Sequence, residues 1–259
     1  TEISTLATEI DRVYSEVTRT LGANLEQLVL TGSGNTSGYG NELANTIWGN
    51  SGSNYLWGGA GNDTMYGNDG SDTLYGSTGV DSMVGGNGND YYYVDVAGDV
   101  TVETSTVTTE IDRVYSEVTR TLGANFEQLV LTGSGNNYGY GNELANTISG
   151  NSGANYLGGG DGNDTLSGGI GNDTLYGGTG NDSMVGGSGN DTYYVDSPGD
   201  VVVETSTLAT EIDTVYSSLS HLLGNNVERL GLTGAEAING YGNNLANTLS
   251  GNSANNYLS

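Results

Sequence analysis

Aspartate recurs at every ninth residue in two glycine-rich stretches of the chain, always at the sixth position of a nonapeptide such as Gly58–Tyr66. Carboxylate oxygens are the ligands that hard divalent cations bind, and glycine turns let main-chain carbonyl groups point toward one centre. The residue types and their spacing therefore indicate cation binding. Eight aspartates hold this sixth position: Asp63, Asp72, Asp81, Asp90, Asp164, Asp173, Asp182 and Asp191.

The charge of the chain narrows the classes of protein to which it can belong. Its 259 residues include 31 Asp plus Glu, five Arg and no Lys, for a net charge of −26, and 45 Gly but no Cys. This balance excludes an electrostatic nucleic-acid binder, and it argues against binding to anionic membranes. No apolar run is long enough for a membrane helix, so membrane insertion is not expected. Low hydrophobicity with high charge predicts disorder unless a polycation neutralises the chain, and calcium is the usual one.

The elements that position these aspartates follow a long internal repeat. Thr8–Ser15 recurs at Thr109–Ser116 and again, with one change, at Thr210–Ser217, so the period is 101 residues. Because solenoids normally carry atypical terminal repeats, we expect one continuous solenoid that extends beyond both ends or stacks on copies of itself. The predicted organisation is a first unit at 1–93 (wide coils 1–39, nonapeptide block 40–93), a second at 94–194 (wide coils 94–140, block 141–194) and a partial third at 195–259.

Within each block the eighth position of the nonapeptide is apolar, as at Ile47, Leu56 and Met65. One large apolar residue in nine is too few for an amphipathic helix. The pattern predicts a three-residue strand with one inward side chain, followed by a six-residue glycine turn. The wide coils are predicted to contain strands at 99–102, 111–114 and 127–131.

The nonapeptides of Gly58–Tyr93 and Gly159–Tyr194 resemble the G-G-x-G-x-D-x-U-x motif of the repeats-in-toxin (RTX) family. The resemblance implies an all-β, right-handed parallel β-roll in which two nonapeptides form one coil. Calcium would lie between turns eighteen residues apart, held by the aspartates at position six and by glycine carbonyls. Asp99 and Asp200 fall eighteen residues after Asp81 and Asp182 and are candidates for an additional site. The glycines assigned to these sites are Gly58, Gly61, Gly76, Gly79, Gly85, Gly88, Gly159, Gly162, Gly168, Gly171, Gly177, Gly180, Gly186 and Gly189.

Electrostatics gives an independent reason for a cation. Coils stacked roughly 4.8 Å apart would place Asp63 next to Asp81, and the two charges would repel by about 3 kcal/mol at an effective dielectric near 20. A divalent ion turns this repulsion into a cross-link, so the calcium-free chain should be largely unfolded. Asparagine takes the sixth position at Asn45, Asn54, Asn146 and Asn155. There we expect weak or no calcium binding and a ladder of stacked amides.

The remaining polar residues are given simpler interpretations. His221 aligns with Arg19 and Arg120 of the other units, so it is expected to be a surface cation and not a catalytic base. Tyr92 and Tyr193 are expected to fill the core at the end of each block. Solvated surface charge is expected at Asp69, Asp95, Asp161 and Asp196, and it is favoured over calcium ligation at Asp99 and Asp200 as well.

No constellation in the sequence predicts an enzyme. Acidic pairs recur in every unit, whereas an active site is usually single, and a phosphate-binding loop of the Walker type would need a lysine. We therefore expect an extracellular structural protein, such as a fibre, a surface-layer element or an adhesin stalk, that forms a homopolymer or a longer chain of the same repeats. The alternative is a calcium-folded secretion domain of an exported enzyme. Asn35 heads an Asn-Thr-Ser sequon in an expected exposed turn and is a candidate for glycan attachment.

Overall fold

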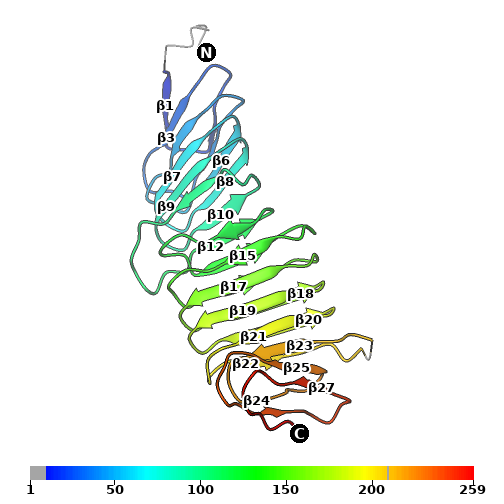
Figure 1. Cartoon of the computed structure of the whole chain (residues 1–259). Coiled ribbons are helices and arrows are strands. Elements are labelled where there is room, and N and C mark those ends of the chain that lie inside the picture. The colour runs from blue at the N-terminus through cyan, green and yellow to red at the C-terminus, as the bar shows by residue number, and fades with distance from the viewer. Residues whose placement is uncertain (1–9, 209) are drawn as a thin grey trace. The chain divides into compact units, whose positions relative to one another are not determined.

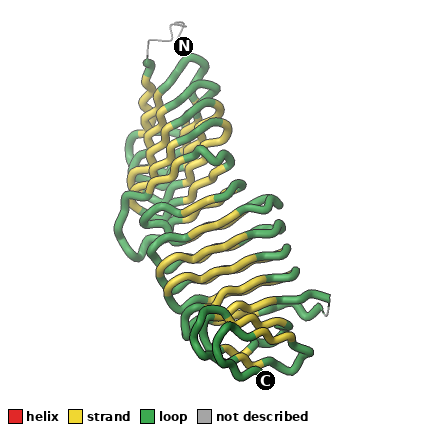
Figure 2. Tube along the Cα trace, in the orientation of Figure 1, coloured by secondary structure: helices red, strands yellow, loops and turns green. Residues whose placement is uncertain are grey.

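The computed structural model describes residues 10–208 and 210–259, and these residues form short β-strands joined by turns, without a helix among them. The described part of the chain also contains no helix long and apolar enough to cross a membrane. Two compact units are present, Thr1–Val118 with Gly123–Gln128, and Thr119–Leu122 with Leu129–Ser259. Figure 2 shows how strands alternate with turns along each unit.

The first unit contains two parallel sheets, and successive strands of the chain alternate between them (Figure 1). Each strand pairs with the strand two places along the chain, and in the nonapeptide block the register step is eighteen residues, as in Ile47↔Met65. One sheet has the order β1 (Arg12–Ser15), β3 (Gln27–Leu30), β5 (Thr46–Trp48), β7 (Thr64–Asp69), β9 (Ser82–Asn87) and β11 (Val100–Val102). Those strands of the other, eleven-stranded sheet that lie in this unit have the order β2 (Arg19–Thr20), β4 (Ser37–Tyr39), β6 (Tyr55–Ala60), β8 (Thr73–Thr78), β10 (Tyr91–Val94) and β12 (Arg113–Ser116).

The second unit repeats this arrangement. One sheet has the order β13 (Arg120–Thr121), β15 (Tyr138–Tyr140), β17 (Tyr156–Asp161), β19 (Thr174–Thr179), β21 (Thr192–Val195), β23 (Thr214–Ser217), β25 (Arg229–Leu232) and β27 (Thr248–Ser250). The alternate strands of this part of the chain pair with one another in the order β14 (Gln128–Leu131), β16 (Thr147–Ser149), β18 (Thr165–Ile170), β20 (Ser183–Ser188) and β22 (Val201–Val203). A separate pair is β24 (His221–Leu222) with β26 (Gly240–Tyr241).

The core consists of single columns of inward side chains. Ile47, Met65 and Met83 follow one another in adjacent strands of one sheet, and Leu56 and Leu74 do so in the other; all five are fully buried. These are the eighth positions of the nonapeptides, so this prediction is confirmed. The all-β parallel solenoid is confirmed as well, because the printed strand pairs are parallel and join coils one turn apart.

The prediction of three-residue strands is confirmed for the first strand of each block, β5 and β16, but is wrong for the strands that follow. The next four strands of each block, β6–β9 and β17–β20, run for six residues because pairing resumes across the turn, where Gly59 pairs with Ser77 and Ala60 with Thr78. The glycine bends the strand without ending the ladder, since adjacent coils bend at the same place. In the wide coils the strands lie at Val100–Val102, Arg113–Ser116 and Gln128–Leu131, within two residues of the predicted ranges.

Candidate metal sites at the edges of the coils

The aspartates of position six form columns in which each carboxylate binds the coil before it. Oδ1 of Asp81 accepts the N–H of Asp63 at 2.8 Å, and Oδ1 of Asp90 accepts that of Asp72 at 2.7 Å. The second unit repeats this pattern, for example from Asp173 to Asp191 at 2.7 Å. The predicted stacking of aspartates eighteen residues apart is therefore confirmed. One carboxylate oxygen of each residue serves the backbone.

The other carboxylate oxygen, Oδ2, is buried in every one of these aspartates. Among the described residues, none makes a hydrogen bond to it, and the aspartates are at most 1% exposed. A buried polar atom without a partner costs free energy, and a charged one costs more. A cation beside these oxygens removes that cost. The oxygens concerned are Oδ2 of Asp63, Asp72, Asp81, Asp90, Asp164, Asp173, Asp182 and Asp191.

The glycines at position one leave room for this oxygen. A Cβ at Gly58 would collide with Oδ2 of Asp63 and would lie 2.8 Å from the carbonyl oxygen of Gly76, in the next coil. A Cβ at Gly67 would likewise collide with Oδ2 of Asp72. A carboxylate oxygen and a carbonyl oxygen thus converge beside each of these glycines. This donor set fits calcium, which prefers hard oxygen ligands and accepts a variable number of them.

Glycine is required at position one for a different reason than at positions two and four. Positive φ angles occur at positions two and four, for example 109° at Gly59 and 102° at Gly61, but not at Gly58. Position one is glycine because of the space that Oδ2 takes, and positions two and four because of the turn. Asn68 and Ser77 replace glycine at position two and keep left-handed φ angles of 76° and 66°.

Burial raises the pKa of these aspartates. The pKa of Asp63 and of Asp72 rises to about 7, and that of Asp90 to about 8, mainly because burial penalises the charged carboxylate. Neighbouring carboxylates raise these pKa values further, such as Asp81 beside Asp63. The columns therefore favour neutral aspartates unless a cation is bound beside them.

Asp99 and Asp200 extend the columns as the eighteen-residue spacing suggested. Oδ1 of Asp99 accepts the N–H of Asp81 at 3.0 Å, and Oδ1 of Asp200 accepts that of Asp182 at 3.1 Å. Their second oxygens, however, accept local N–H groups, from Val96 to Asp99 at 3.2 Å and from Ser197 to Asp200 at 3.0 Å. Both oxygens are thus used by the backbone, which distinguishes these two residues from the eight others.

The expected ladder of stacked amides is not formed. Nδ2 of Asn45 donates to the carbonyl of Leu25 at 3.0 Å, and Nδ2 of Asn54 donates to that of Thr36 at 3.1 Å. The coil before Asn45, Asn54 and Asn155 presents a carbonyl group, whereas the coil before each aspartate presents an N–H group. Asparagine can donate a hydrogen bond and an ionised aspartate cannot, so the polarity of the adjoining backbone matches the choice between them.

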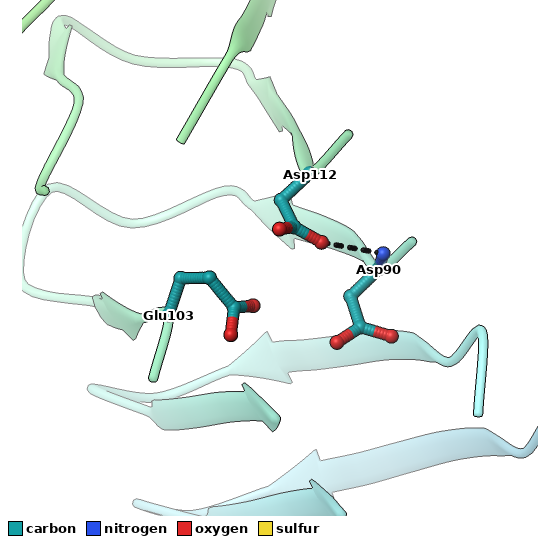
Figure 3. Close-up of side chains that lie close together, drawn as sticks. All are labelled: Asp90, Glu103 and Asp112. Atoms are coloured by element: carbon teal, nitrogen blue, oxygen red, sulfur yellow. Dashed lines mark hydrogen bonds between the residues drawn. The ribbon is translucent and has the colours of Figure 1, made fainter. Parts of the chain in front are cut away.

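Acidic residues that were not predicted as ligands lie next to the last aspartate of each block. Asp90, Glu103 and Asp112 each offer an oxygen within 4.8 Å of the others, as do Asp191, Glu204 and Asp213 (Figure 3). A signal for the glutamates was present, because Glu103 falls eighteen residues after Gly85 and Glu204 eighteen after Gly186. They therefore occupy the position-one register of a coil that is no longer a nonapeptide.

The other predictions have mixed outcomes. Tyr92 and Tyr193 are fully buried core residues, as predicted. His221 is not a surface cation: it is half-buried, and burial lowers its pKa, so the neutral imidazole is favoured. Surface exposure is confirmed for Asp69, Asp161 and Asp196, but Asp95 and Asp200 are half-buried and Asp99 is buried.

Stacked parallel coils with carboxylate-lined glycine turns define a β-roll of the metal-binding class. The family model of the RTX calcium-binding nonapeptide repeat matches the chain four times, at residues 39–74, 66–100, 131–166 and 158–193. The chain belongs to this RTX repeat family. No curated protein matches the sequence.

Proposed function

We propose that the chain is a structural module of an extracellular protein, a fibre, surface layer or adhesin stalk, whose coils are held together by calcium. The observation that carries this proposal is the set of eight buried Oδ2 atoms for which no hydrogen-bond partner is found among the described residues. Each would hold calcium, and beside Asp63, Asp72, Asp164 and Asp173 the carbonyl oxygen of a position-one glycine in the next coil would join it as a ligand. The ion supplies the positive charge that cross-links adjacent coils.

The repeat supports a role in an elongated assembly of many coils. Each coil pairs with the coils before and after it, so a solenoid of this kind grows by the addition of equivalent units. We place further copies of the same 101-residue repeat beside this one, either within one chain or as stacked subunits. Asn35, which is exposed, is the proposed site of glycan attachment.

The concentration of calcium supports a location outside the cell. Calcium sites in extracellular modules are tuned to dissociation constants of about 0.1–1 mM, which cytosolic calcium does not reach. A chain whose carboxylates repel one another without the ion would then stay unfolded before export and fold afterwards.

Circular dichroism and electron microscopy of the chain, in chelator and then in calcium up to about 10 mM, test the proposal. We expect a change from coil to β-structure together with the appearance of filaments. The doubly substituted variant Asp72→Asn with Asp173→Asn should need more calcium to fold. The matched control, Asp69→Asn with Asp161→Asn, removes the same charge from exposed positions and should behave as the original chain.

Two other results would count against parts of the proposal. Folding with calcium but without filaments would favour the alternative, a calcium-folded domain that assists the secretion of an attached enzyme. A chain that is fully folded in chelator and indifferent to calcium would refute the assignment of the eight aspartates.

A further inference from the structure

Each nonapeptide block ends where the coil becomes wider. Within the block an aspartate N–H donates to the carboxylate eighteen residues on, but Asp90 donates to Asp112, twenty-two residues on, at 2.7 Å. In the second unit the N–H of Asp191 donates to Oδ1 of Asp213, also twenty-two residues on, at 2.7 Å. The last turn of each block is therefore followed by a coil of different sequence.

At this last turn a carboxylate takes the place of a main-chain carbonyl. A Cβ at Gly67 would approach Oδ2 of Asp72 and lie 2.6 Å from the carbonyl oxygen of Gly85, one coil further. A Cβ at Gly85 would approach Oδ2 of Asp90 and lie 2.8 Å from Oε2 of Glu103. Glu103 thus supplies an anionic oxygen where the preceding turn has a neutral one.

We infer that the two clusters Asp90–Glu103–Asp112 and Asp191–Glu204–Asp213 are cation sites of a second kind, each binding one calcium-sized ion through three carboxylates. The inference rests on the proposed function in that it assumes the turns of this chain bind calcium. It goes further because it assigns new ligands and a different ligand charge. These sites would also connect each block to the coil that follows it.

An independent observation points to a ligand in each cluster. Asp90 is fully buried, and Oδ2 of Asp90 finds no hydrogen-bond partner among the described residues although it is directed at Glu103 (Figure 3). Asp191 repeats this in the second unit, with Oδ2 likewise unpartnered there. The partner that such an oxygen lacks, next to two further carboxylates, is positive charge.

The glutamate is held in position for this role. Oε1 of Glu103 accepts the N–H groups of Thr104 at 2.6 Å and Ser105 at 2.9 Å. Oε2 accepts the hydroxyl of Tyr92 at 2.7 Å, and the ring of Tyr92 packs edge-on against Phe126. Glu204 has the corresponding bonds from Ser206 and from Tyr193. The side chain is therefore oriented before an ion arrives, which favours binding.

Three carboxylates carry more negative charge than one carboxylate with carbonyl groups. Calcium sites become tighter as the number of charged ligands and the rigidity of the site increase. The two clusters should therefore fill at lower calcium concentrations than the glycine turns.

Calcium titration of the full chain against a competing chelator tests the inference. In the variant Glu103→Gln with Glu204→Gln, the two tightest ions should be lost or weakened at least tenfold. The control variant Glu42→Gln with Glu143→Gln removes the same charge at two exposed, equivalent positions and should keep these ions. Equal ion numbers and affinities in the two variants would overturn the inference.

A crystal structure of the original chain with calcium keeps the test independent of how the variants fold. Anomalous density bonded to Asp90, Glu103 and Asp112 is expected. Filled glycine turns with empty clusters, in which Asp90 and Glu103 share a proton, would overturn this inference and leave the proposed function intact. Filled clusters with empty glycine turns would support this inference and count against the proposed function.

Discussion

Acid should fold the calcium-free chain, because the charge on the buried aspartates is what opposes folding. Burial raises the pKa of Asp72 in the folded chain from 3.8 to about 7 and that of Asp81 to about 6. A carboxylate whose pKa is raised by folding destabilises the folded state at any pH above the unfolded value. Folding stability without calcium should therefore be highest below about pH 4, fall as the pH rises to about 7–8, and stay low above it.

The size of the effect decides the outcome. A pKa moved from 3.8 to about 7 corresponds to about 4 kcal/mol, and about 2 kcal/mol remains after allowing for the hydration that these groups keep. The pKa is raised to between about 6 and about 8 in nine aspartates, seven of position six together with Asp112 and Asp213, and it is also raised in Asp182. Several such penalties in one folded chain are comparable to the 5–15 kcal/mol by which domains are typically stable. For Asp72, whose pKa in the folded chain is about 7, the full penalty falls to about 40% at about pH 5, because the group is then protonated in the folded chain.

Far-ultraviolet circular dichroism of the calcium-free chain between about pH 8 and pH 5 measures this, with sedimentation to exclude aggregates. We expect coil at the higher pH and β-structure at the lower, and no pH dependence in excess calcium. The variant Asp72→Asn with Asp173→Asn should fold at a higher pH than the control Asp69→Asn with Asp161→Asn. A chain that remains coil at about pH 5, or is folded without calcium at about pH 8, would refute the reasoning.

Three further substitutions test single features of the turns and the core. In the variant Gly76→Ala with Gly177→Ala, each new Cβ collides with Oδ2 of Asp81 or of Asp182, so the calcium concentration at the midpoint of folding should rise at least tenfold. The control Gly34→Ala, whose Cβ meets nothing within 4 Å, should leave this midpoint unchanged. Asn54→Asp replaces the donor to the Thr36 carbonyl by a carboxylate and should lower the free energy of unfolding, measured in urea with calcium, by about 1–3 kcal/mol. The control Asn35→Asp keeps an acceptor for the N–H of Ser53 and should lower it little. Equal losses in the two variants would contradict the assignment of Asn54 as a required donor. Leu74→Ala empties a fully buried position and should cost about 2–5 kcal/mol in thermal unfolding, against almost nothing for the exposed Leu43→Ala, and a small loss at Leu74 would mean that the single-file core collapses around the gap.

The repeat period was enough to predict how the coils are built. One apolar residue in nine defines a single inward position per strand, and stacking at eighteen residues places Asp63 next to Asp81 and Leu56 next to Leu74. Those predictions succeed because they depend only on spacing, and stacked coils of equal length keep the spacing without further information.

Spacing could not predict what depends on the atoms of the neighbouring coil. The need for glycine at Gly58 comes from Oδ2 of Asp63 and the carbonyl of Gly76, and the need for a donor at Asn54 comes from the carbonyl of Thr36. Both are contacts between coils and have no trace in local propensity.

The acidic clusters at the end of each block also depend on contacts between coils that spacing could not predict. The sequence determined that Glu103 lies eighteen residues after Gly85, and that this coincidence recurs at Glu204 and Gly186. Only the tertiary structure decided that the following coil closes after twenty-two residues, which brings Asp112 to Asp90. The length of a coil outside the repeat is set by how its side chains pack against the coil before it, and no period in the sequence encodes that packing.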